Sequence, residues 1–137
     1  MAETIRETVN GILGLAEAND WISFDIRVLD IGDEPLYLDW ATKEGLVDPR
    51  LSARDLALSI FENTNIQPIL TEVQEKGLQQ ILTKDENLHL RRKSAFALFK
   101  YGNRTPGVID QIKEAAEKDD ELKYTAQKLL DQFSAGA

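Results

Sequence analysis

Apolar residues recur at helical spacing along most of this chain. In residues 3–18 they fall at i, i+4, i+7, i+8 and i+11, which places them on one face of an α-helix. Gly11 and Gly14 interrupt that helix and weaken it by roughly 1 kcal/mol each relative to alanine. Asn19 and Asp20 end or cap it. The stripe consists of Ile5, Val9, Ile12, Leu13 and Ala16.

Five further helices are predicted after residue 48. We expect Ser52 to cap the first and Pro68 to open the second, with Ile69, Leu70, Val73, Gly77 and Ile81 on its inner face. Residues 87–101 form the third, which Gly102 stops, and Thr105 caps the fourth. The last helix has the cleanest stripe: Leu122, Ala126, Leu129, Leu130 and Phe133.

Residues 21–40 allow two interpretations. Ile22, Phe24, Ile26 and Val28 alternate with polar residues, and Leu36, Leu38 and Trp40 repeat the alternation, which is typical of a β-hairpin. The other interpretation makes 21–31 and 35–44 two helices, with Asp33 as N-cap, Pro35 in the first turn and Gly45 as the stop. An isolated hairpin is marginally stable, and two helices would complete a helical array. We favour the helices.

One phrase of residues recurs three times in the chain. It consists of an acidic residue, a basic residue six, seven or four positions later, an alanine three positions after that, and a large apolar residue four positions further on. The alanines of successive copies are 38 and 31 residues apart, and a period in this range is typical of stacked helix pairs. A small alanine lets two helices approach closely. The copies are Asp48, Arg54, Ala57, Phe61; Asp85, Arg92, Ala95, Phe99; and Asp119, Lys123, Ala126, Leu130.

These copies resemble the HEAT-repeat family, and more broadly the armadillo-type α-solenoids, over about residues 48–134. The resemblance implies an all-α fold: a short right-handed α-solenoid of antiparallel helix pairs, with about seven helices in one domain. Residues 1–47 would then be an N-terminal cap or a degenerate repeat. The resemblance also implies a ladder in which Asp48, Asp85 and Asp119 bond Arg54, Arg92 and Lys123.

Composition narrows the environment and the function. The chain has 137 residues, 42% of them hydrophobic, and no cysteine, which excludes disulfides and a thiolate nucleophile. With no leader sequence and no long apolar run, we expect a soluble cytoplasmic protein that binds no membrane. The formal charge of −8 opposes binding to nucleic acid and favours a basic partner.

No set of residues predicts catalysis, a metal or a cofactor. His89 is the only histidine and has no catalytic companion, so we interpret it as structural. The acidic clusters at 30–34, 85–86 and 119–121 precede predicted helices, where they complement the helix dipole. The one basic cluster lacks a phosphate loop, and whether it binds a phosphate stays open; it comprises Arg91, Arg92, Lys93, Lys100 and Arg104.

The surface of the array is the remaining candidate for function. By the resemblance, the second helix of each pair faces a concave surface, and there it carries Glu72, Glu75, Gln79, Asp110, Glu114 and Glu117. Tyr37, Trp40 and Trp21 rank next, because aromatic residues are enriched at interfaces. We therefore predict a non-enzymatic adaptor or regulator that binds a protein partner on an acidic concave face. An inhibitor or immunity-type protein that neutralises a basic enzyme such as a nuclease ranks second, and a HEAT-like phycobilin lyase third.

Overall fold

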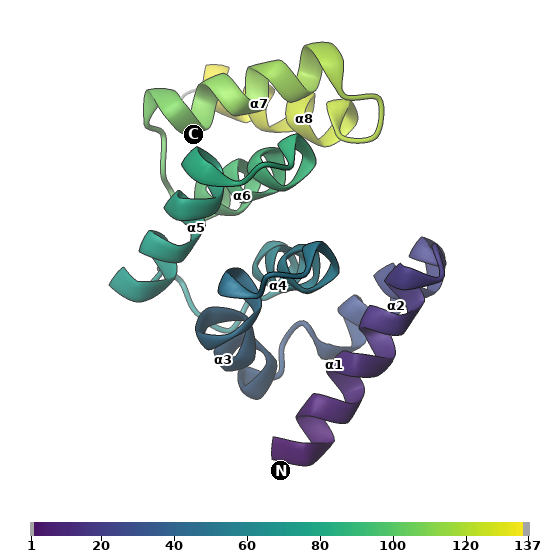
Figure 1. The fold of residues 1–137 in the computed structure, drawn as a ribbon. Helices are drawn as coiled ribbons and strands as arrows, with labels where there is room; N and C mark the ends of the chain where they lie inside the picture. The colour runs from purple at the N-terminus through teal and green to yellow at the C-terminus, as the bar shows by residue number, and fades with distance from the viewer. Residues whose placement is uncertain (1, 136–137) are drawn as a thin grey trace. The chain divides into compact units, whose positions relative to one another are not determined.

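The computed structural model describes the backbone of residues 2–135 and the side chains of residues 5–135, and this part of the chain is helical (Figure 1). The all-α prediction is confirmed, with eight α-helices in the described residues rather than about seven. The elements are α1 (Ala2–Glu17), α2 (Trp21–Ile31), α3 (Pro35–Lys43), the short 3-10 helix η1 (Gly45–Val47), α4 (Leu51–Asn63), α5 (Glu72–Lys84), α6 (Leu88–Lys100), α7 (Pro106–Lys118) and α8 (Lys123–Ser134).

The hairpin interpretation of residues 21–40 is wrong, because α2 and α3 occupy this stretch. The side chain of Asp20 caps α2 by accepting a hydrogen bond from the Ser23 N–H at 3.2 Å. Phe24, Val28 and Ile31 fall on one helical face and are buried. Ile22, Ile26 and Leu29 lie on the opposite face, and the two interleaved stripes produce the alternation that suggests a strand.

Helix α5 begins later than the sequence predicts. Pro68 and Ile69 precede it, and Thr71 is its N-cap in a capping box: Thr71 Oγ1 accepts from the Gln74 N–H at 3.2 Å, and Gln74 Oε1 accepts from the Thr71 N–H at 2.9 Å. The shifted start exposes Ile69 and Val73, which we expected to be buried. The residues of α5 that are buried are Gln74, Leu78, Ile81 and Leu82.

Replacing Thr71 with alanine is expected to lower the free energy of unfolding by about 1 kcal/mol, because it removes the hydroxyl that accepts from the Gln74 N–H at the start of α5. Urea unfolding of the full chain measures this loss. Thr105→Ala is the control, since Thr105 is also an N-cap but its hydroxyl bonds the exposed Asn103 side chain instead of an amide of its own helix. Equal losses in the two variants would show that the capping box adds nothing.

Of four other predicted helix ends, the structure confirms two and corrects two. Thr105 stands at the N-cap of α7, and Gly102 follows α6 with a φ of 96°, a left-handed conformation that suits glycine. Ser52 is not a cap, because α4 already begins at Leu51. Asp33 is not the N-cap of α3 either; Glu34 holds that position, and Asp33 Oδ1 instead accepts from the Asn65 N–H at 2.9 Å.

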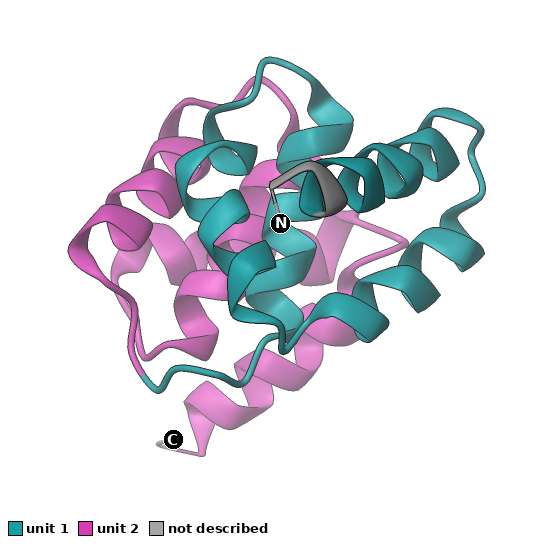
Figure 2. Ribbon diagram, turned by 90° about the horizontal axis from the view of Figure 1, so that it is seen from below, with its two compact units in different colours: residues 1–68 teal, residues 69–137 magenta. Residues whose placement is uncertain are grey.

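The helices group into two compact units, residues 1–68 (unit 1) and 69–137 (unit 2), coloured separately in Figure 2. In unit 1, α4 packs against α1, α2, α3 and η1. In unit 2, α6 packs against α5, α7 and α8. Each unit is therefore built around one central helix, and each central helix carries a copy of the recurring phrase.

The recurring phrase also has a repeating local geometry. The aspartate of each copy precedes a helix, and its Oδ1 accepts the backbone N–H two residues later, at 2.8 Å for Asp48, 2.9 Å for Asp85 and 3.1 Å for Asp119. Such a turn sets the direction in which the next helix starts. The three alanines of the phrase are fully buried. The last copy lies on α8. We predicted a buried apolar stripe on this helix, but Ala126 is its one buried residue. The arrangement as a right-handed solenoid of antiparallel pairs stays a prediction.

Candidate functional site

The net negative charge of the chain lies in unit 1. Residues 1–68 contain 13 acidic and 5 basic residues, which accounts for the whole net charge of −8. Residues 69–137 contain 11 of each and are neutral overall. A partner that recognises the acidity of this protein would therefore recognise unit 1.

Unit 1 also has a groove of about 460 Å³ between α1 and α3. Its apolar lining comes from Ile5 and Val9 of α1 and from Leu36 and Trp40 of α3. The two aromatic residues of α3 that we predicted at an interface, Tyr37 and Trp40, differ in exposure. Tyr37 is buried in the core, whereas Trp40 is half-buried and lines the groove. The remaining lining residues are polar: Arg6, Asn10, Asp39, Glu44, Asp48 and Arg50.

Close packing at η1 holds Trp40 in place. A Cβ atom on Gly45 would lie 2.7 Å from Ala57 Cβ and 2.9 Å from Trp40 Cζ3. Only glycine fits at this point, and the buried alanine of the first recurring phrase lies directly beneath it. Gly45 therefore packs closely against one side of the Trp40 indole, and the other side of the indole faces the groove.

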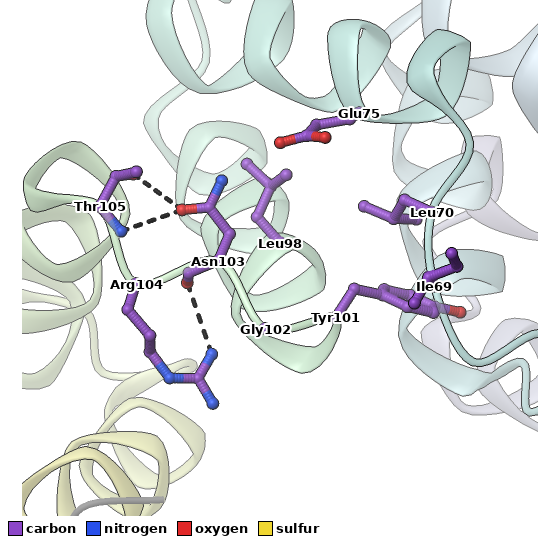
Figure 3. Close-up of a pocket in the computed structure, with 9 residues that line it drawn as sticks. All are labelled: Ile69, Leu70, Glu75, Leu98, Tyr101, Gly102, Asn103, Arg104 and Thr105. Carbon is purple, nitrogen blue, oxygen red and sulfur yellow. Dashed lines mark hydrogen bonds between the residues drawn. The ribbon is translucent and has the colours of Figure 1, made fainter.

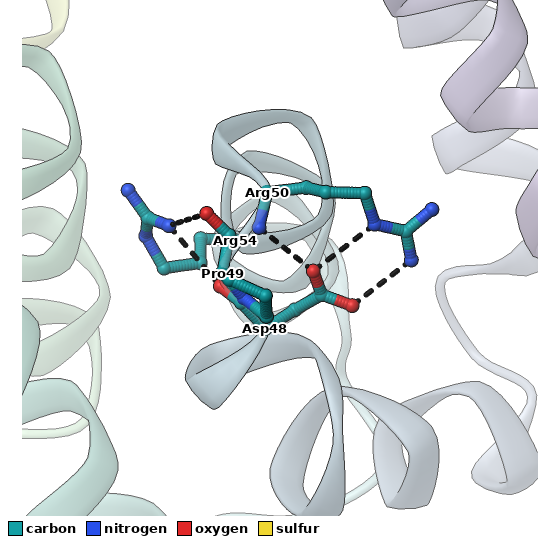
Figure 4. A network of polar contacts seen from close by, with 4 residues as sticks. All are labelled: Asp48, Pro49, Arg50 and Arg54. Atoms are coloured by element: carbon teal, nitrogen blue, oxygen red, sulfur yellow. Dashed lines mark hydrogen bonds and ion pairs between the residues drawn. The ribbon is translucent and has the colours of Figure 1, made fainter.

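An ion pair stands at the rim of this groove (Figure 4). Arg50 donates to Asp48 through Nε at 3.1 Å and Nη2 at 2.9 Å. The hydrogen bond from Arg50 lowers the pKa of the Asp48 carboxyl below its ordinary value. For the expected pair of Asp48 and Arg54, the structure shows a contact through the backbone: Arg54 Nη1 donates to the Asp48 and Pro49 carbonyl oxygens at 3.1 and 2.9 Å.

One ladder contact does form in unit 2, between successive copies of the phrase. The buried Arg92 donates from Nη1 to Asp119 Oδ2 at 2.9 Å, and its Nη2 lies 3.6 Å from Glu114 Oε1. Burial raises the pKa of Asp119, but hydrogen bonds from Arg92, Leu122 and Glu121 outweigh it and lower the pKa overall. Lys123 pairs with Asp120 at 3.7 Å rather than with Asp119.

The predicted acidic strip is divided between α5 and α7. Glu72, Glu75 and Gln79 line a hollow of about 540 Å³ on α5, together with Lys76, Gln80, Thr83 and Lys84. Two acidic and two basic residues balance there, and Glu72 lies 3.9 Å from Lys76. On α7, Asp110 and Glu117 are exposed, while Glu114 is half-buried beside Arg92. The strip is therefore less acidic than the sequence suggests.

A second pocket in unit 2, of about 390 Å³, follows the end of α6 (Figure 3). Its polar groups serve the local fold: Asn103 Oδ1 accepts from Thr105 N and Oγ1, and Arg104 stacks on the Phe99 ring at 3.5 Å. In Figure 3 the Arg104 side chain extends away from Glu75. Burial raises the pKa of the Tyr101 hydroxyl. No nucleophile and base lie paired among these lining residues.

The basic cluster also has mainly structural contacts. Arg91 Nε donates to the Asp85 carbonyl oxygen, Arg92 is paired as above, and Lys93 is buried. Lys100 Nζ lies 5.5 Å from the centre of the Tyr101 ring. His89 is half-buried on α6, and the residues that the structure describes contain no group of three potential metal ligands.

The sequence analysis did not identify two features: the location of the net negative charge in unit 1, and an exposed apolar face on α2. Counting charges in each half of the chain would have revealed the first.

None of the described helices has the length and apolar character needed to cross a membrane. Comparisons with protein families, curated proteins and solved structures give no match.

Proposed function

We propose that this protein is a non-enzymatic protein-binding module whose partner is basic and docks on unit 1. The observation that carries the proposal is the distribution of charge: unit 1 holds the net −8, and unit 2 is neutral. Complementary charge steers association and disfavours partners of the wrong sign. On this proposal the docking surface lies in unit 1 instead of on the strip of α5 and α7 that the sequence favours.

The groove beside Trp40 supports the proposal, because it combines an apolar floor with charged groups at its rim. Such a cleft takes an apolar side chain of a partner and orients it through the rim. A half-buried tryptophan held on one side by close packing is also suited to an interface, because it loses little side-chain entropy on binding. HEAT-like adaptor proteins remain the class to which we assign this module.

The second candidate is an inhibitor of a basic enzyme, such as a nuclease. The same concentration of charge supports it, because a dense negative unit can occupy a site built for a polyanion. The two candidates differ in outcome: an inhibitor abolishes the activity of its partner, whereas an adaptor leaves that activity intact.

Charge reversal tests the proposed function. Peptides are first selected on the full chain from a display library of random 16-residue sequences, and their affinities are then measured for two variants. Asp39→Lys with Glu44→Lys changes the groove rim, and Glu72→Lys with Glu117→Lys changes unit 2 by the same total charge. We expect the first pair to weaken binding at least tenfold and the second less than threefold. Equal losses would show that only total charge matters, and no loss would refute the proposal.

A second variant tests the groove itself. Leu36 lines the groove and is 40% exposed, while Leu51 is 44% exposed and does not line it. Leu36→Glu places a charge on the apolar floor, so we expect binding of the selected peptides to fall at least tenfold. Leu51→Glu is the matched control, and a similar loss there would exclude the groove as the docking site.

A further inference from the structure

Helix α2 has two apolar faces, and its neighbours cover only one of them. Phe24, Val28 and Ile31 pack into the core of unit 1, where α2 contacts α1 and α4. On the other side, Ile22, Ile26 and Leu29 are 79%, 56% and 69% exposed. These three are spaced at i, i+4 and i+7, so they form a continuous ridge about two turns long.

Acidic residues stand on both sides of this ridge. At about 100° per residue, Asp25 and Asp30 project to either side of the line through Ile22, Ile26 and Leu29. Both aspartates are exposed, and Asp33 and Glu34 follow just beyond the end of the helix. Arg27, the single basic residue of α2, is rotated by about 140° from Ile22, toward the core side.

The pattern decides between possible occupants of the ridge. A second copy of this chain would bring the same acidic flanks against these, in a unit that already carries the net charge of −8. An anionic lipid surface would be repelled in the same way. An amphipathic helix with an apolar stripe between lysine or arginine residues satisfies both the ridge and its flanks.

We propose that the α2 ridge, defined by Ile22, Ile26 and Leu29 with Asp25 and Asp30 beside it, docks a basic amphipathic helix of a partner protein. This inference deepens the proposed function, because it specifies the structural class of a basic partner. It shares no residue with the groove beside Trp40 and stands on a separate observation. Its own test therefore leaves the groove intact.

The probe is a fluorescein-labelled 14-residue peptide of leucine and lysine with helical periodicity, and its control is a scrambled peptide of identical composition. Fluorescence anisotropy with the full chain measures both affinities. We expect the helical peptide to bind at least tenfold more tightly than the scrambled one. Ile22→Gln with Ile26→Gln and Leu29→Gln should weaken binding at least tenfold, and Asp25→Asn with Asp30→Asn at least threefold, with a reduced dependence on salt.

Ile69→Gln with Val73→Gln is the matched control, because those residues are exposed apolar side chains of unit 2. Circular dichroism verifies that every variant remains helical. Equal binding of the scrambled peptide, or an equal loss in the unit 2 control, would overturn the proposal. If Leu36→Glu weakened peptide binding and the α2 variant did not, the peptide would bind in the groove. That result would contradict the α2 proposal and leave the proposed function standing. Self-association or binding to anionic vesicles that the α2 variant abolishes would assign the ridge to another occupant.

Discussion

Replacing Arg92 with alanine is expected to lower the free energy of unfolding by about 3–5 kcal/mol, because it leaves the carboxylate of Asp119 without its buried counter-charge. The Arg92 side chain is 9% exposed and bonds Asp119 at 2.9 Å, so water screens the pair poorly. The pair also joins the start of the last copy of the recurring phrase to the copy before it. Urea unfolding of the full chain measures the loss.

Two controls separate the ion pair from simple loss of volume. Arg92→Met with Asp119→Asn removes both charges, and we expect it to be less destabilising than Arg92→Ala. The second control is pH. Because the folded pKa of Asp119 is lowered, its contribution to stability is complete above the ordinary aspartate pKa of 3.8 and is lost as the pH falls through the lowered value. Asp119→Asn should therefore show a weaker loss of stability in acid than the wild type, and identical acid profiles would contradict this assignment.

Replacing Gly45 with alanine is expected to destabilise the protein by about 1–3 kcal/mol through overpacking. The added methyl would lie 2.7 Å from Ala57 Cβ and 2.9 Å from Trp40, so the indole or α4 must move. The change should therefore also alter the tryptophan fluorescence and weaken binding at the groove. Thermal unfolding and peptide affinity measure the two effects.

Gly11→Ala is the matched control for this substitution. A Cβ at Gly11 would meet nothing within 4 Å, and Gly11 lies inside α1. We expect this variant to be stabilised by up to about 1 kcal/mol, because alanine favours the helix. If both glycine variants were equally stable, the close contact beneath Trp40 would not constrain the fold.

Sequence periodicity predicted the helices well wherever one apolar stripe dominated, as in α1. It was ambiguous in α2, where Phe24 and Val28 face the core while Ile22 and Ile26 face outward. Two stripes on opposite faces of a helix imitate the alternation of a strand, and only tertiary contacts distinguish them. At α5 the capping box of Thr71 and Gln74, rather than Pro68, set the start of the helix.

The candidate site was only partly predictable. Trp40 was identified because aromatic residues are enriched at interfaces, but its groove depends on α1, whose packing the local pattern does not specify. The acidic strip of Glu72 and Glu114 was expected from the HEAT-repeat resemblance, in which the second helix of each pair faces a concave surface. Local pattern could not show that Glu114 approaches Arg92, because that contact depends on how the consecutive helices α6 and α7 pack against each other.

The central claim is that unit 1 recognises a basic partner. The most direct measurement is an NMR titration of the ¹⁵N-labelled full chain with the tightest peptide from the random library. We predict that this peptide carries a net positive charge and that the amide shift changes concentrate in residues 5–50, on α1, α2 and α3. A neutral or acidic peptide, or shift changes centred on α5 to α8, would contradict the account.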